Sequence, residues 1–207
     1  MKKITNLLTL GVAVFSLAAC ASGNKVSEEK FREEVNNLPE HQYSEATLKV
    51  KSNMHMEMLG QSEDENVDST FHYTWDADKK EWVAQEEDGK DYADNLVSVK
   101  DLNLEAIVPT GGEAAEFIEG EYEISYYVNP LKVAFKINGT VNTETEGSKI
   151  NGYEKGSGSV VFDKYGFMTS CDIKIDMNLT MSGTVLGTEI STSMVMNGDM
   201  QLSASYK

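Results

Sequence analysis

Residues 167–181 read FMTSCDIKIDMNLTM. Apolar and polar side chains alternate along this stretch, with Cys171, Ile173 and Ile175 on odd positions and Asp172 and Lys174 between them. A period of two is typical of a β-strand that buries one face. At roughly 3.4 Å per residue the stretch would extend about 50 Å, well beyond the usual strand. Such a strand is expected to twist and curl.

The same alternation continues on both sides of this stretch and predicts a sheet of long strands. Apolar phases run through residues 46–58, 67–75, 122–128, 131–141, 160–162 and 190–206, and a partner for 67–75 begins near Glu81. Turns are predicted at 60–65, 76–80, 163–166 and 183–188, and Gly156-Ser157-Gly158 is interpreted as a hairpin loop.

Helical periodicity is confined to short segments. Ser27 is a candidate N-cap for a helix with Phe31, Val35 and Leu38 on one stripe, and Pro39 ends it. Short helices are also expected within 94–108 and at 113–118. The predicted fold class is therefore mainly β: a long-stranded antiparallel meander forming a half-barrel or barrel, with an N-terminal helix and one or two short helices.

The helices carry too few apolar residues to cover several long strands. The remaining apolar surface must pack on itself across a barrel or hold a hydrophobic ligand. Methionines dominate this surface: apart from Met1, only Met168 falls on the polar phase. Flexible thioethers suit variable acyl chains, although they also fill cores. The ligand-lining candidates are Met54, Met56, Met58, Phe71, Phe135, Ile173, Ile175, Met177, Met181, Met194, Met196 and Met200.

Composition and motifs exclude other classes of function. The formal charge of −16 has the wrong sign for a nucleic-acid binder. The sequence has no H-E-x-x-H, C-x-x-C or G-x-S-x-G motif, so we expect no catalytic residue, metal site or cofactor. His55 and His72 could approach each other across two strands on the polar face, but they are expected to be surface residues, because two histidines without a third ligand do not make a zinc site. Cys171 is expected to be a small buried hydrophobe, and Asp76 and Asp78 to lie in a solvated turn.

The first twenty residues predict export and a lipid anchor. Lys2 and Lys3 precede an apolar run over residues 7–19, as in a secretory signal. The segment Leu17-Ala18-Ala19-Cys20 resembles a bacterial lipobox, which implies lipidation of the Cys20 thiol. The expected organisation is a signal peptide over 1–19, a lipidated tether over 20–26 and one β-rich extracytoplasmic domain over 27–207. The membrane is then reached through the N-terminal lipid.

The lipobox, short tether, N-terminal helix and meander of long strands together are similar to the LolA-like and LppX/LprG-like lipoproteins. Those proteins are half-barrels that carry acyl chains or glycolipids. The resemblance implies a lipid-anchored, extracytoplasmic binding protein that holds a hydrophobic ligand without catalysis. The alternative is a structural or interaction lipoprotein of the cell envelope whose sheet is fully self-packed, although nothing in the sequence identifies a protein partner.

Overall fold

A computed structural model describes residues 23–58, 60–96, 98–100, 118–145, 148–185 and 188–207. The predicted signal peptide, Cys20, and most of the helical segments expected within 94–108 and 113–118 lie outside these residues. The predicted division into signal peptide, tether and domain therefore stays a prediction.

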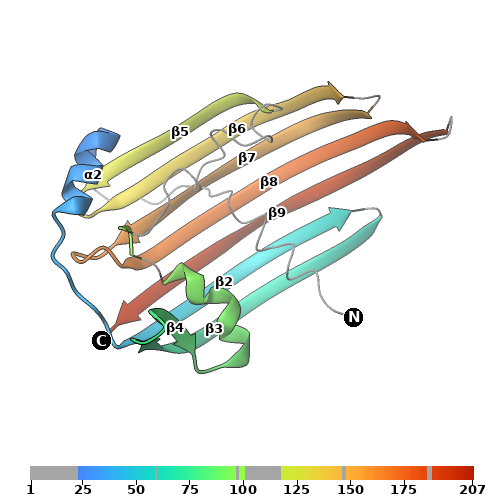
Figure 1. Cartoon of the computed structure of the whole chain (residues 1–207). Helices are drawn as coiled ribbons and strands as arrows, with labels where there is room; N and C mark the ends of the chain where they lie inside the picture. Colours follow the sequence, from blue (N-terminus) through green and yellow to red (C-terminus); the bar gives the residue numbers. More distant parts are fainter. Residues whose placement is uncertain (1–22, 59, 97, 101–117, 146–147, 186–187) are drawn as a thin grey trace.

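One open antiparallel sheet of nine strands forms the body of the protein, in the order β1-β5-β6-β7-β8-β9-β2-β3-β4 (Figure 1). Its strands are β1 Asn24–Val26, β2 Glu45–Met58, β3 Gln61–Asp76, β4 Glu81–Ala84, β5 Ile118–Val128, β6 Lys132–Thr145, β7 Ser148–Phe162, β8 Met168–Val185 and β9 Thr188–Tyr206. Helix α2 Glu28–Asn36 and the 3₁₀ helix η1 Glu87–Asn95 are the helices of the described residues. This architecture confirms the predicted fold class in its half-barrel form.

Acidic residues line both edges of the sheet. Among the described residues, β4 pairs only with Tyr73–Asp76 and β1 only with Tyr126–Val128. The remainder of β3 carries Glu63 and Asp64, and β5 carries Glu121. Joining two negatively charged edges would place like charges opposite one another. The charge on both edges therefore disfavours their pairing, in keeping with the open sheet.

Helix α2 begins where the sequence predicts and ends at Asn36, so Leu38 of the predicted stripe lies just beyond it. The Ser27 hydroxyl accepts a hydrogen bond from the Lys30 amide at 3.3 Å, and Glu28 in the first turn complements the helix dipole. Phe31 and Val35 are buried, and the Phe31 ring lies 5.2 Å from the ring of Tyr126 in β5. Burial of this stripe holds the helix on the apolar side of the sheet.

Three of the predicted turns are wrong in extent or kind. Strand β3 starts at Gln61, so the connection after β2 is confined to residues 59–60, and Gly60 has a φ of 73°. Strands β8 and β9 continue to Val185 and from Thr188, inside the turn predicted at 183–188. The predicted hairpin loop at 156–158 lies in the middle of β7. In each case backbone pairing with a long neighbouring strand overrides the local turn signal.

A β-bulge corrects the assignment of Met168. Val161 pairs with Ser170 but Phe162 pairs with Met168, so Thr169 is an extra residue in β8. The Thr169 hydroxyl donates a hydrogen bond to the Val161 carbonyl oxygen at 3.2 Å. The bulge shifts the strand phase by one residue, and Met168 is buried in the core instead of facing the polar side.

The sequence does not predict the 3₁₀ helix η1, Glu87–Asn95. This helix reaches the segment expected to be helical within 94–108 only at its end, and most of that segment lies outside the described residues. The Tyr73 hydroxyl donates a hydrogen bond to the Gly89 carbonyl oxygen at 2.8 Å. A Cβ atom at Gly89 would lie 3.1 Å from the Phe71 ring, so glycine permits this close approach. Leu96, directly after the helix, is buried in the same core.

Candidate hydrophobic binding face

All the predicted ligand-lining residues lie on one face of the sheet, which we call the apolar face. The strand register places Phe135 opposite Gly158, and Gly158 opposite Ile173. Ile173 is opposite Met200 in β9. The same alternation continues through β2 and β3, because directly paired residues share a face.

Helices cover one end of the apolar face. Helix α2 packs on β5, and η1 packs on β3 and β4, near the strand ends at the left of Figure 1. At this end four of the predicted ligand-lining residues are buried within the hydrophobic core: Phe71, Phe135, Ile173 and Ile175. Ile173, for example, is 3% exposed. These four residues contribute to core packing. They differ from the other candidates in being buried.

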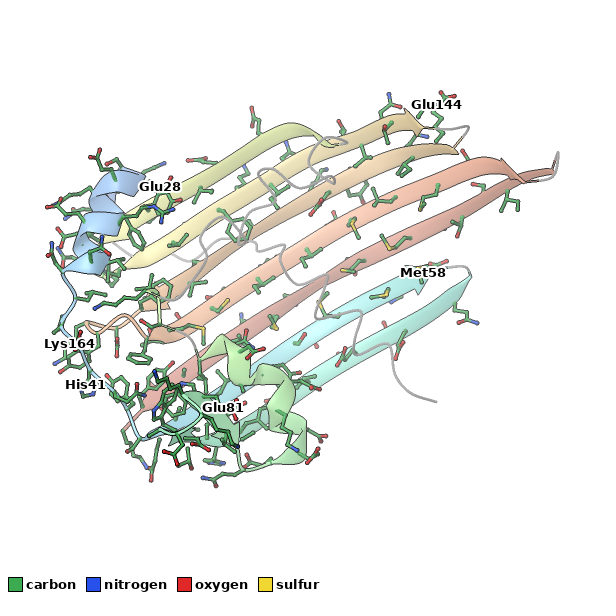
Figure 2. The ribbon with its side chains drawn as sticks, in the orientation of Figure 1. Glu28, His41, Met58, Glu81, Glu144 and Lys164 are labelled. Atoms are coloured by element: carbon green, nitrogen blue, oxygen red, sulfur yellow. The ribbon has the colours of Figure 1, made fainter. Side chains whose placement is uncertain are left out.

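The remaining candidates form a methionine surface at the other end of the same face. It consists of Met54, Met56, Met58, Met177, Met181, Met194, Met196 and Met200. Met58 is 38% and Met181 47% exposed, and the others are half-buried. Met177, Met196 and Met56 lie opposite one another on β8, β9 and β2. Figure 2 shows sulfur atoms along these strands, with Met58 near the end of β2.

Glu154 is a site residue that the sequence analysis missed. Its neighbour Tyr153 faces the polar side, where its hydroxyl donates to an Asp176 carboxylate oxygen at 3.1 Å. Glu154 therefore lies on the apolar face, opposite Met177, and only 6% of it is exposed. Burial raises the pKa of its carboxyl group. The glycines of β7 concealed this strand, and the face of Glu154 follows only from the strand register.

The polar face holds an open, shallow cavity of about 640 Å³ in the middle of the sheet. Its charged lining residues are Lys136, Lys155, Lys174, Asp176 and Asp199. Lysines and carboxylates alternate between neighbouring strands here: Lys155 pairs with Asp176, and Lys174 with Asp199. This cavity does not suit an apolar ligand, and its opposite charges lie next to one another.

The two strand histidines do not approach each other. His55 Nδ1 lies 2.7 Å from Asp64 Oδ1, and His72 Nδ1 lies 2.8 Å from Glu86 Oε1. His72 pairs with Thr47, eight residues from His55 along β2, or about 27 Å at 3.4 Å per residue. The described part of the chain contains no group of three potential metal ligands.

Cys171 behaves as the sequence predicts. The side chain is 3% exposed on the apolar face, and burial together with Asp172 raises the pKa of its thiol to about 12. The thiolate is therefore scarce at neutral pH, and the residue packs as a small hydrophobe. The predicted turn is also present, because Asp76 Oδ1 accepts hydrogen bonds from the Asp78 and Lys79 amides.

Comparison of the chain with protein-family models, with curated proteins and with solved structures finds no match. Among the residues that the structure describes, no helix is long and apolar enough to cross a membrane.

Proposed function

We propose that this protein is a lipid-anchored extracytoplasmic binding protein that holds a lipid or another hydrophobic ligand on its methionine surface, without catalysis. The observation that carries the proposal is the uneven cover of the apolar face. One end is sealed by α2 and η1, whereas Met58 and Met181 at the other end remain 38% and 47% exposed.

Chemistry supports a ligand of variable shape. Methionine side chains are unbranched and polarizable, so they adapt to acyl chains that differ in length or branching. A contiguous apolar surface exposed to water is costly and marks an interaction site. Within the described residues, the middle of the polar face has the opposite character, because charged side chains of both signs line its cavity.

The anchor forms the second part of the proposal. The Leu17-Ala18-Ala19-Cys20 segment supplies an acceptor thiol for lipid at the start of a short tether. Attachment through lipid keeps the domain near the bilayer, from which a hydrophobic ligand would come. The strongly negative chain is poorly suited to bind anionic headgroups directly.

The self-packed interaction lipoprotein remains the second candidate. The observation that favours it is the tight core at the covered end, where Ile173 and Phe135 are almost fully buried. In that case the methionine surface would meet another part of a protein assembly, and no lipid would be retained.

A pair of aspartate substitutions on β9 tests the proposal. Met196 lies on the apolar face between Met177 and Met56, whereas the adjacent Val195 lies on the polar face. We expect Met196→Asp to reduce the lipid that copurifies with the protein from its host membranes by at least tenfold, because a charge cannot be buried against an acyl chain. Val195→Asp adds the same charge and should leave lipid retention unchanged.

Lipid is quantified by mass spectrometry, and protection of the Cys171 thiol confirms that each variant is folded. Absence of copurified lipid in the wild type, or equal retention by the two variants, would reject a ligand-binding role for the methionine surface.

A further inference from the structure

Glu154 is a buried carboxyl group near the middle of the apolar face. It lies on β7, opposite Met177 of β8 on one side and Gly139 of β6 on the other. Only 6% of the residue is exposed. It therefore borders the methionine surface at the strand where that surface begins.

Glycines surround this carboxyl group on the side away from Met177. Gly152 and Gly156 lie two residues before and after it on the same face of β7, and Gly139 is followed by Gly120 in β5. A Cβ atom at Gly120 would lie 2.4 Å from the Asn138 carbonyl oxygen, so a side chain there would collide with the backbone. The strand positions directly beside the carboxyl group, at Gly139 and Gly120, therefore carry no side chain.

No hydrogen bond or ion pair from the described residues reaches the Glu154 carboxyl group, and burial is the single cause that raises its pKa. An unpaired buried carboxylate loses its hydration without compensation. Groups of this kind are concentrated at functional sites. The natural partner of such a group is a hydrogen-bond donor carried by the ligand.

We propose that Glu154 binds the cationic ammonium group of an amphiphile whose alkyl chain extends over the methionine surface. This inference rests on the proposed function and assigns its ligand class. A charged donor compensates a desolvated carboxylate more fully than a hydroxyl group does, whereas a fatty-acid carboxylate is repelled. From Glu154 the chain crosses Met177 and Met196 to Met56, three strand spacings or about 14 Å. An extended dodecyl chain has about this length.

Three photoreactive dodecyl probes test the head-group preference on the full-length protein in its host membranes. The probes carry an ammonium, a hydroxyl or a carboxylate head, with the photoreactive group next to the head and an affinity tag at the chain end. The protein is isolated after irradiation, and the label is quantified in the tryptic peptide 150–155, which contains Glu154. Wild type is compared with Glu154→Gln and with Glu121→Gln, a matched change on the opposite face of β5.

We expect the ratio of ammonium to carboxylate labelling to be at least tenfold higher in the wild type than in Glu154→Gln. The hydroxyl probe should give an intermediate value, and Glu121→Gln should match the wild type. Each probe partitions into the membrane to the same extent for every variant, so the effect of partition on labelling cancels when the ratios of two variants are compared. Cys171 protection shows whether the variants are folded.

The outcomes distinguish this inference from the proposed function. Labelling of the methionine strands by all three probes, with ratios that agree within twofold across the variants, would overturn the role of Glu154 while supporting a lipid-binding face. Absence of labelling by every probe would reject the proposed function, and the inference with it. If Glu154→Gln fails to fold, equal ammonium and carboxylate labelling in the wild type, after correction for the amount of each probe in the same membranes, would overturn the inference.

Discussion

Replacement of Met194 by tryptophan distinguishes an open apolar surface from a packed one. Met194 is half-buried, and its neighbours on the apolar face are Leu179 of β8 and Met58 of β2, which is 38% exposed. A larger ring has room on such a surface, so we expect the free energy of unfolding to change by less than about 0.5 kcal/mol. Lipid retention should fall, because the ring occupies the surface that the alkyl chain needs.

Ile173→Trp provides the reference for a packed position. Ile173 is 3% exposed and lies between Gly158 and Met200 on the same face. The indole ring would push neighbouring side chains off their preferred rotamers, and we expect a loss of about 1–3 kcal/mol. A loss of 1.4 kcal/mol corresponds to about a tenfold smaller folding equilibrium constant. The expected stability changes of Met194→Trp and Ile173→Trp therefore differ measurably.

Unfolding in urea is monitored by circular dichroism. The dependence of the unfolding free energy on urea concentration must be equal for all variants, so that differences in the midpoint report differences in stability. Copurified lipid is measured on the same preparations. If Met194→Trp loses as much stability as Ile173→Trp while lipid retention is unchanged, the methionine surface is packed interior, and the reasoning from its exposure is refuted.

Three further predictions concern single residues. Cys20→Ser should abolish fatty-acid labelling and leave an unprocessed precursor, since the thiol is the expected lipid acceptor; normal labelling of this variant would contradict the lipobox. Cys171 should resist a thiol reagent in the folded protein and react after denaturation, because burial raises the pKa of its thiol to about 12; rapid native modification would show that the apolar face is open there. Burial also raises the pKa of the Glu154 carboxyl group, so in the ligand-free protein the neutral carboxyl group costs no stability at low pH, and stability is lost as the pH rises through the folded-state pKa. Glu154→Gln should therefore equal the wild type near pH 4 and be more stable by about 1–3 kcal/mol at pH 8, measured by urea denaturation; an equal difference at both pH values would contradict this origin.

The alternation of apolar and polar residues predicted the strands correctly wherever apolar side chains occupied the positions that face the core. Strands β2, β8 and β9 follow the pattern of residues 46–58, 167–181 and 190–206. The predicted apolar faces of these strands are also confirmed, because burial of one face determines the register in which a strand pairs with its neighbours. The methionine surface could thus be located from sequence, but its separation from the packed core could not. That separation depends on where the two helices lie.

Glycine and local irregularity account for the errors. Gly156 and Gly158 carry no side chain to show an apolar phase, so β7 looked like a loop and Glu154 was assigned to no face. In the structure the strand register places Gly156 between Ile137 and Ile175, and Gly158 between Phe135 and Ile173. The extra residue Thr169 in β8 is equally invisible in the pattern. In each case pairing with the adjacent strands, and not the side-chain pattern of the segment itself, determines the structure.

The open edges and the methionine surface are connected through the open form of the sheet. Glu63 and Asp64 on β3 and Glu121 on β5 disfavour pairing of the two edges, and in an open sheet the two halves of the apolar face do not cover each other as in a barrel. Helices α2 and η1 replace this cover only at one end. Thioethers at the uncovered end meet water until a ligand or partner excludes it. A carboxyl group at the border of that surface would then orient a bound amphiphile, because it favours the head group over the alkyl end.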